Sequence, residues 1–250
     1  MQVALVTVGD ELLAGDTENT NATWLASQLT DRGVAVARIL VVPDDRAVIA
    51  ERVRAYSEAH DAVLVTGGLG GTPDDVTMAA VADAFDRDLA VDDLARADVE
   101  ETLAAIADEY PDLDVDVERE ASIPAGARPL LNRGGLSPGC VVENVYVLPG
   151  IPAEMRTMFE DVAGEFAGRT VSAFLYTEAP ETNLVGPLTD AQAQFDVRVG
   201  CYPDRDAGHN RLKVTGEDED AVAAAVEWLR EEVSTVPAPE DADGDASDGG

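Results

Sequence analysis

The sequence is poor in lysine, histidine, cysteine and aromatic residues, and each scarcity excludes a class of function. It has 250 residues with a single lysine, Lys213, against 50 acidic side chains, and its net charge is −33. So negative a chain argues against nucleic acid partners, whose phosphates require Lys and Arg to displace counterions, and against anionic membrane surfaces. The two cysteines and two histidines have no metal-ligand spacing, so we expect neither a disulfide framework nor a zinc site.

Long apolar runs are also missing, and none approaches the ~20 residues that a membrane helix needs. The start, MQVALVTVGDELL, lacks the basic segment and small-residue cleavage site of a signal peptide, so we expect a cytoplasmic protein. The acidic residues are spread over the whole chain, which favours adaptation to molar salt, where self-repulsion is screened. Most carboxylates are then background, and each needs a second reason before a function is assigned to it.

Apolar strand patterns and amphipathic helix patterns alternate along the first part of the chain. Residues 3–8, 34–42 and 62–66 predict buried strands, and residues 21–32 and 46–60 predict helices between them. The order β-α-β-α-β predicts an α/β fold with a mostly parallel sheet that is covered by helices on both faces.

The middle of the chain carries weaker patterns. Thr72 predicts a helix N-cap, with Asp75 as the acidic half of a capping box. Residues 92–110 predict a surface helix, and the alternation DLDVDVE at residues 112–118 predicts a strand with one wet face. The segment VVENVYVLPG predicts a hairpin, and a further helix is expected over residues 153–166.

Gly168 marks a predicted domain boundary. Residues 1–168 form the predicted α/β domain, and residues 169–236, with three strand patterns followed by a helix pattern, predict a small α+β domain. Residues 237–250, PAPEDADGDASDGG, contain no apolar side chain beyond Ala and Pro, and they predict a disordered acidic tail.

Two glycine-containing loops follow predicted strands, which is where open α/β sheets bind ligands. The first is residues 9–13, and the second is TGGLGGTPDDVT at residues 66–77. The second loop offers backbone amides to an anion, yet it has no P-loop lysine and lacks the dinucleotide spacing. Asp74 and Asp75 would repel a phosphate unless a divalent cation lay between them. The loop therefore predicts a metal-assisted phosphate or pyrophosphate site, to which Asp10 and Asp44 belong by their positions after neighbouring strands; the alternative is that Asp75 only caps its helix.

Five segments, taken in order, resemble one known family. They are GDELLAGDTENTNATWLASQL, VVPDD, TGGLGGTPDDVT, IPAGARPLLN with SPG, and VLPGIPAEMRTMF. Together they are similar to the amino-terminal domain of the competence/damage-inducible CinA proteins, within the molybdopterin-binding superfamily. The resemblance covers residues 1–168 and implies a MogA/MoaB-like three-layer fold, while the segment after it looks like the small domain that follows in such proteins. Gly71 stands where the family usually has Pro, and no deamidase domain follows, so nucleotide deamidation is not expected.

The resemblance implies two activities. Some relatives adenylylate molybdopterin with a nucleotide and Mg²⁺, and the CinA-like branch hydrolyses the pyrophosphate of ADP-ribose or FAD with a divalent metal and often K⁺. We expect the second: a metal-dependent nucleotide pyrophosphatase that uses Mg²⁺, Mn²⁺ or Co²⁺, with K⁺ as a further cofactor. A molybdopterin adenylyltransferase and a non-catalytic pterin- or nucleotide-binding module remain as alternatives. The expected partner is a small nucleotide or pterin, and the relatives imply a homo-oligomer.

The family motifs assign roles to individual residues. Asp44 and Asp75 match the acidic residues that the family ties to catalysis and metal binding. Glu154 and Glu11 also match motif positions, and we take them as the candidates for positioning the attacking water. The remaining candidates are expected to bind the substrate, and they are Gly9, Asp10, Asn21, Thr66, Gly67, Gly68, Gly70, Gly71, Thr72, Pro149 and Gly150.

Overall fold

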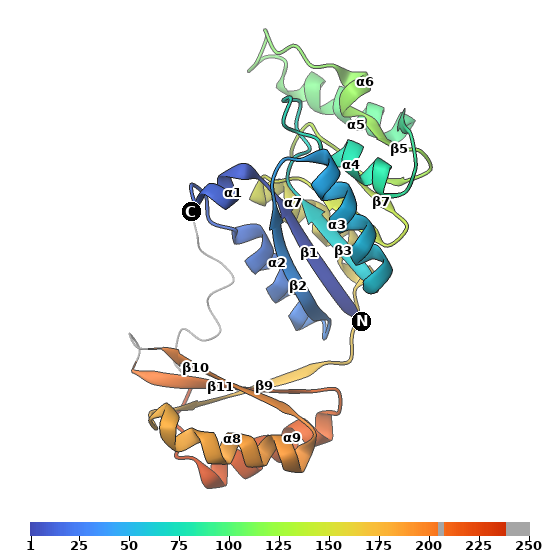
Figure 1. Ribbon diagram of the computed structural model, residues 1–250. Helices are drawn as coiled ribbons and strands as arrows, with labels where there is room; N and C mark the ends of the chain where they lie inside the picture. Colours follow the sequence, from blue (N-terminus) through green and yellow to red (C-terminus); the bar gives the residue numbers. More distant parts are fainter. Residues whose placement is uncertain (205–207, 239–250) are drawn as a thin grey trace. The chain divides into compact units, whose positions relative to one another are not determined.

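The computed structural model describes residues 1–204 and 208–238. The chain divides into two compact units, residues 1–168 and residues 169–250 (Figure 1). From residue 239 onward, the tail predicted from composition lies outside the described residues. Within the described ranges, no helix is long and apolar enough to cross a membrane.

A six-stranded sheet forms the centre of the first unit, in the order β2-β1-β3-β8-β7-β6. The four strands β2, β1, β3 and β8 run parallel, whereas β7 runs antiparallel to both of its neighbours, β8 and β6. The strands are β1 (Gln2–Val8), β2 (Ala35–Val42), β3 (Ala62–Thr66), β6 (Arg128–Leu130), β7 (Gly139–Val142) and β8 (Val145–Leu148). This is the mostly parallel sheet that the strand patterns predicted, and its β7–β8 pair is the expected hairpin.

Helices cover both faces of this sheet, which gives three layers (Figure 1). Val3 and Leu5 of β1 share one apolar core with α2 (Thr20–Asp31) and α7 (Pro152–Val162). Val6 and Val8 point to the other face, where they share a second core with α3 (Arg46–Ala59) and α4 (Thr77–Ala84). Because successive side chains of a strand point to opposite faces of the sheet, β1 contributes side chains to both cores. The smaller elements are α1 (Asp10–Ala14), β4 (Leu89–Val91), α5 (Asp93–Ile106), α6 (Val117–Glu120), β5 (Ser122–Pro124) and η1 (Ala163–Glu165).

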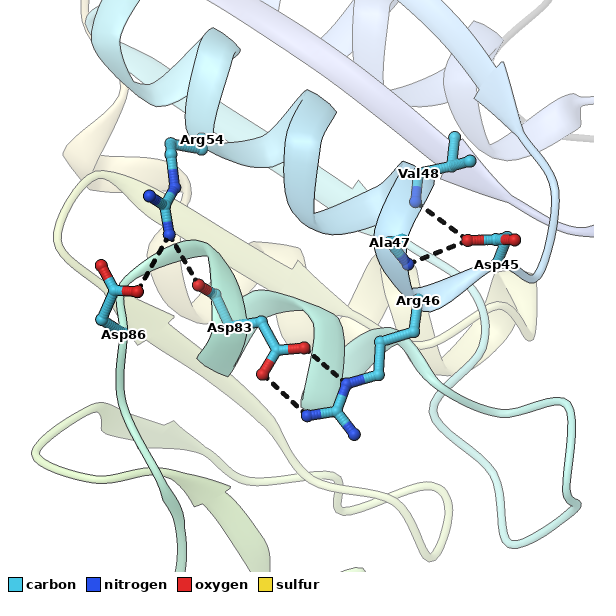
Figure 2. A network of polar contacts seen from close by, with 7 residues as sticks. All are labelled: Asp45, Arg46, Ala47, Val48, Arg54, Asp83 and Asp86. Carbon is cyan, nitrogen blue, oxygen red and sulfur yellow. Dashed lines mark hydrogen bonds and ion pairs between the residues drawn. The ribbon is translucent and has the colours of Figure 1, made fainter.

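Two arginines of α3 tie this helix to α4 (Figure 2). The Arg46 guanidinium donates to both carboxylate oxygens of Asp83, at 2.5 and 2.7 Å. Arg54 donates to the carbonyl of Asp83 and to the carboxylate of Asp86. These contacts lie on the exposed surface between the two helices, and both helices follow loops that lead into the site described below.

Three local predictions were wrong. The loop expected over residues 9–13 is the short helix α1, whose first turn carries Asp10 and Glu11, the residue types that suit a helix N-terminus. In the other two cases side chains compete for the backbone. The helix expected from Thr72 begins only at Thr77, because the Thr72 side chain bonds to Asp74 and Asp75 within a turn instead of capping a helix. The strand expected over residues 112–118 does not form. Its Asp116 instead accepts the Arg119 N–H and caps the short helix α6.

The second unit is an antiparallel three-stranded sheet with two helices packed on one face (Figure 1). The strand order is β10-β11-β9. Its elements are β9 (Val171–Thr177), α8 (Glu181–Phe195), β10 (Arg198–Asp204), β11 (His209–Gly216) and α9 (Glu219–Glu232). Helix α8 was not anticipated because Pro187 stands inside it and masks its periodicity.

Candidate functional site

A pocket of about 250 Å³ lies at the carboxyl ends of the four parallel strands. Gly9 follows β1, Asp44 follows β2, Gly67 follows β3 and Gly150 follows β8. This is the edge where α/β sheets bind ligands. The pocket lining includes nine of the residues proposed from sequence, namely Gly9, Glu11, Asn21, Asp44, Thr66, Gly67, Gly68, Asp75 and Gly150.

The pocket is negatively charged. Among the described residues that line it, none is Lys, Arg or His, and five are acids: Glu11, Glu18, Asp44, Asp74 and Asp75. Burial raises the pKa of Asp44, and the charges of Asp10, Glu11 and Asp74 raise it further, against a hydrogen bond from the Asp10 N–H that lowers it. A raised pKa means that the ionised carboxylate is poorly stabilised by its surroundings. A cation would offset the repulsion between these carboxylates, whereas a bare phosphate would add to it.

Asp44 and Asp45 are neighbours in sequence, but their carboxylates face different surroundings. Asp45 accepts the N–H groups of Ala47 and Val48 at 2.9 and 3.0 Å and caps α3 (Figure 2). Asp44 takes no part in that cap and faces the pocket instead. The pair therefore places a helix-capping carboxylate and a pocket-lining carboxylate at adjacent positions.

The glycines of the second loop let the backbone approach the pocket closely. Gly67 and Gly68 have φ values of 102° and 66°, which side-chain-bearing residues rarely adopt. A Cβ at Gly67 would collide with the Val8 carbonyl, and one at Gly68 would collide with the Thr77 hydroxyl and lie 3.5 Å from the Asp44 Oδ1 atom. Gly68 thus occupies a gap between two oxygen-bearing side chains that no larger residue fits.

Two buried oxygens at this place have no hydrogen-bond partner among the described residues. They are the hydroxyl of Thr77, a residue that is 0% exposed, and the Oδ1 atom of Asn21. The Asn21 amide nitrogen is satisfied by Thr66 and by the Gly150 carbonyl. Leaving such groups unpaired costs free energy. Asn21 lines the pocket, and Thr77 lies next to Gly68 of the lining.

These donors fit a hard divalent cation. Carboxylate, hydroxyl and amide oxygens are the ligands that Mg²⁺ and similar ions take in proteins, and they leave positions for phosphate oxygens. Within the described ranges, no three His, Cys, Asp or Glu side chains are grouped so that they could hold a metal. A cation here would therefore complete its coordination with hydroxyl, amide, water or substrate oxygens.

Thr72, Asp74 and Asp75 form a compact turn beside the pocket. The Thr72 N–H donates to Asp75 at 2.9 Å, and the Thr72 hydroxyl lies 2.5 Å from one carboxylate oxygen of each aspartate. This contact lowers the pKa of Asp74. Asp75 does not cap α4, whose N-cap residue is Val76. The turn holds two charged carboxylates at the pocket rim.

The other candidates lie around the pocket rather than in its lining. Asp10 reaches it through its N–H, which donates to Asp44, and Pro149 through its carbonyl, which accepts the Thr66 hydroxyl at 2.6 Å. Gly70, Gly71 and Thr72 belong to the adjoining loop. Glu154 does not join the group, because its carboxylate accepts a 2.7 Å hydrogen bond from Asn132 and packs against Gly135.

Sequence reasoning missed Glu120, a half-buried residue of α6. Its carboxylate accepts the Ser137 hydroxyl at 2.9 Å and would lie 3.0 Å from a Cβ added at Gly71. Burial raises the pKa of Glu120, and the charge of Asp75 raises it further. No motif could have pointed to this residue, because it is one carboxylate within an acid-rich stretch and its position depends on α6.

Comparison with known proteins settles the family. Residues 4–168 match the family described as "Probable molybdopterin binding domain", and residues 169–238 match "FAD synthase, middle domain". The chain belongs to the molybdopterin-binding domain family. The match of the molybdopterin-binding domain begins inside β1 and ends at the last residue of the first unit.

Similar proteins occur in archaea. A protein from Archaeoglobus fulgidus is 37% identical over 233 residues, which cover 92% of this chain and 97% of that protein. A Thermococcus kodakarensis protein is 35% identical over 244 residues, covering 92% and 96%. The crystal structure of CinA from Thermoplasma acidophilum, a protein described as having unknown function, is 35% identical and covers 67% of this chain and 99% of that one, with a TM-score of 0.57. The CinA-like resemblance of the molybdopterin-binding domain is thus confirmed.

Proposed function

We propose that this protein is a metal-dependent hydrolase that cleaves the pyrophosphate of ADP-ribose or a related dinucleotide. The observation that carries the proposal is a pocket lined by five carboxylates and no Lys, Arg or His among the described residues, with an unpartnered Thr77 hydroxyl buried beside it. Such a pocket repels a free diphosphate and accepts one that arrives with a cation.

Each residue then has a defined task. Asp44 and Asp75 hold the cation, whose charge, when it is bound, withdraws electron density from the phosphorus. The backbone amides of residues 68–71 in the loop contact the phosphate oxygens, whereas the N–H groups of Gly67 and Thr72 already donate to Leu148 and Asp75. The Glu11 carboxylate, which lines the pocket, accepts a proton from the attacking water.

The proposed reaction balances without a further reactant. Water adds its oxygen to one phosphorus, the bridging P–O bond breaks, and the products from ADP-ribose are AMP and ribose 5-phosphate. Glu11 replaces Glu154 as the preferred base because only Glu11 lies in the pocket lining. The match of residues 169–238 to the middle domain of FAD synthase supports a nucleotide ligand.

One second function has support of its own. The family description at residues 4–168 names molybdopterin, so the same pocket is a candidate for pterin adenylylation, with molybdopterin as the acceptor in place of water. The carboxylates and the glycine loop would keep their tasks, because a nucleotide diphosphate also forms or breaks in that reaction.

Product analysis separates the two functions. The protein is incubated in low and in molar KCl with Mg²⁺, Mn²⁺ or Co²⁺, and with ADP-ribose, FAD, or ATP plus molybdopterin. We expect AMP from ADP-ribose in a metal-dependent reaction. Adenylylated molybdopterin would instead favour the second function, and saturable binding without any product would refute both enzymatic readings.

Three variants test the site. Asp75→Asn keeps an oxygen that can accept the Thr72 N–H, so we expect it to fold normally and to lose metal-dependent turnover by about 100-fold or more. Asp44→Asn should behave likewise. The matched control is Asp45→Asn, one residue away, which keeps a capping oxygen for α3 and should retain turnover. Full activity in Asp75→Asn would contradict the assignment.

A further inference from the structure

Among the described residues of the second unit, α8 and α9 pack on one face of the sheet and no helix covers the other, which carries aromatic and basic side chains. Its buried side packs Leu175, Leu212 and Val214 against α8 and α9. The opposite positions on paired strands share the other face. There, Phe174 lies across from Lys213, and Arg211 lies between Tyr176 and Tyr202. We call the set Phe174, Tyr176, Arg198, Tyr202, Arg211 and Lys213 the aromatic–basic face.

Two aromatic rings of this face are exposed and make cation–π contacts with basic side chains. Phe174 and Tyr202 are 44% and 49% exposed. The Arg211 guanidinium lies 5.5 Å from the Phe174 ring centre and 5.7 Å from that of Tyr202. The Lys213 ammonium, on the chain's single lysine, also lies 5.7 Å from the Phe174 ring. Exposed aromatic rings of this size are costly to leave to water and are typical of binding surfaces.

Glycine shapes the centre of the face. Gly200 lies across from Lys213, and a Cβ there would meet the Tyr202 ring at 2.8 Å. The Tyr202 ring therefore folds back along β10 over Gly200 rather than standing upright. With neighbouring strands about 4.8 Å apart, the face is ~10 Å wide between β9 and β10. A flat platform of that width suits one planar heterocycle.

The charge of this face opposes that of the chain. Arg198, Arg211 and Lys213 stand on it together with one acid, Asp204 at the end of β10, in a chain with 50 acids and 17 bases. An arginine plane and aromatic rings stack with nucleobases, and Arg and Lys side chains bind phosphate. We propose that the aromatic–basic face binds a free nucleotide, with its base stacked on Arg211 and Tyr202 and its phosphates at Lys213 and Arg198.

The net charge decides between a free nucleotide and a nucleic acid strand. A mononucleotide brings two or so negative charges, all of which fit on the face. A strand would carry further phosphates beyond it, toward a chain of net charge −33. No residue of the aromatic–basic face is among the residues that line the pocket of the first unit, and the proposal does not depend on the proposed pyrophosphatase activity.

The test uses the full chain and AMP as the probe. Binding is measured by equilibrium dialysis with EDTA present, so that the metal-dependent pocket does not contribute, in low and in moderate KCl. We expect saturable binding that weakens about tenfold or more in Arg211→Gln and in Phe174→Ser. Phe174→Tyr keeps a ring and should retain binding. Ribose 5-phosphate, which has no base, should bind at least tenfold more weakly than AMP.

Two control variants locate the site. Arg230→Gln removes an exposed arginine from α9 in the same unit, and it should leave AMP binding unchanged. Asp75→Asn alters the pocket of the first unit and should also leave it unchanged. The proposal is overturned if AMP fails to bind, if Arg211→Gln binds AMP like the unaltered chain, or if Asp75→Asn is the variant that loses it. Tighter binding of a short single-stranded oligonucleotide than of AMP would show that the occupant is a nucleic acid instead.

Discussion

Two buried threonines, Thr66 in the pocket lining and Thr77 next to Gly68, should respond in opposite ways to the same substitution. Thr66 and Thr77 are 2% and 0% exposed. The Thr66 hydroxyl donates to the Pro149 carbonyl at 2.6 Å and accepts from Asn21. The Thr77 hydroxyl has no partner among the described residues. Replacement by valine keeps the shape of each side chain and removes only the hydroxyl.

The expected free energies of unfolding follow from hydrogen-bond accounting. Thr66→Val leaves a buried carbonyl without its donor, and we expect a loss of ~1–3 kcal/mol. Thr77→Val removes a buried hydroxyl that is already unpaired, and we expect a gain of about 1–2 kcal/mol in the ligand-free protein. For a unit of this size, 1 kcal/mol corresponds to roughly 2–4 °C in Tm. The two variants should therefore shift the Tm in opposite directions.

The assay is urea and thermal unfolding of both variants without divalent metal, followed by turnover of ADP-ribose with Mg²⁺. We expect Thr77→Val to be more stable and yet to lose about 10- to 100-fold in turnover, because the Thr77 hydroxyl would gain its hydrogen-bond partner only when the cation and substrate are bound. If Thr77→Val is destabilised as much as Thr66→Val, the hydroxyl has a partner in the free protein and the reasoning fails.

Three further predictions concern other residues. Burial raises the folded-state pKa of Asp44 above 3.8, so its ionised carboxylate destabilises the fold at pH 7, and this penalty disappears as pH falls through the raised pKa toward 3.8. Metal-free Asp44→Asn should therefore be more stable than the unaltered chain at pH 7 and lose this difference in acid. A stability difference at pH 3 equal to that at pH 7 would refute this. Burial raises the pKa of Cys140 to about 12, so a thiol reagent should label only Cys201 in the native protein and both cysteines in urea. The Arg46–Asp83 pair is exposed, so Arg46→Met should barely move the urea midpoint, and a large shift would show that the pair anchors α4.

The strands and the mostly parallel sheet were predictable because buried strands leave long β-branched runs in the sequence. Residues 3–8 and 62–66 lie within strands β1 and β3 for that reason. Elements whose local signals compete were not predictable. Thr72 has the residue type of a helix cap, yet its hydroxyl meets two aspartates that sequence alone does not place. Helix α8 contains a proline that conceals its period.

The site was predictable as far as it depends on strand ends. Gly9, Asp44 and Gly67 follow three parallel strands, so their meeting is a consequence of topology. Contacts that depend on the irregular segments were not predictable. Glu120 reaches Gly71 from α6, and Glu154 turns toward Asn132 rather than the pocket. Neither orientation has a signature in the spacing of residues.

The central claim is that a cation joins the pocket carboxylates to a diphosphate, and the spectrum of bound Mn²⁺ tests it most directly. The full chain is loaded with Mn²⁺ and a methylene-bridged analogue of ADP-ribose that cannot be hydrolysed, and electron–nuclear double resonance is recorded. We predict a phosphorus hyperfine coupling to the manganese that is present in the unaltered chain and absent in Asp75→Asn. Binding of the analogue with no phosphorus coupling in the unaltered chain would contradict the account.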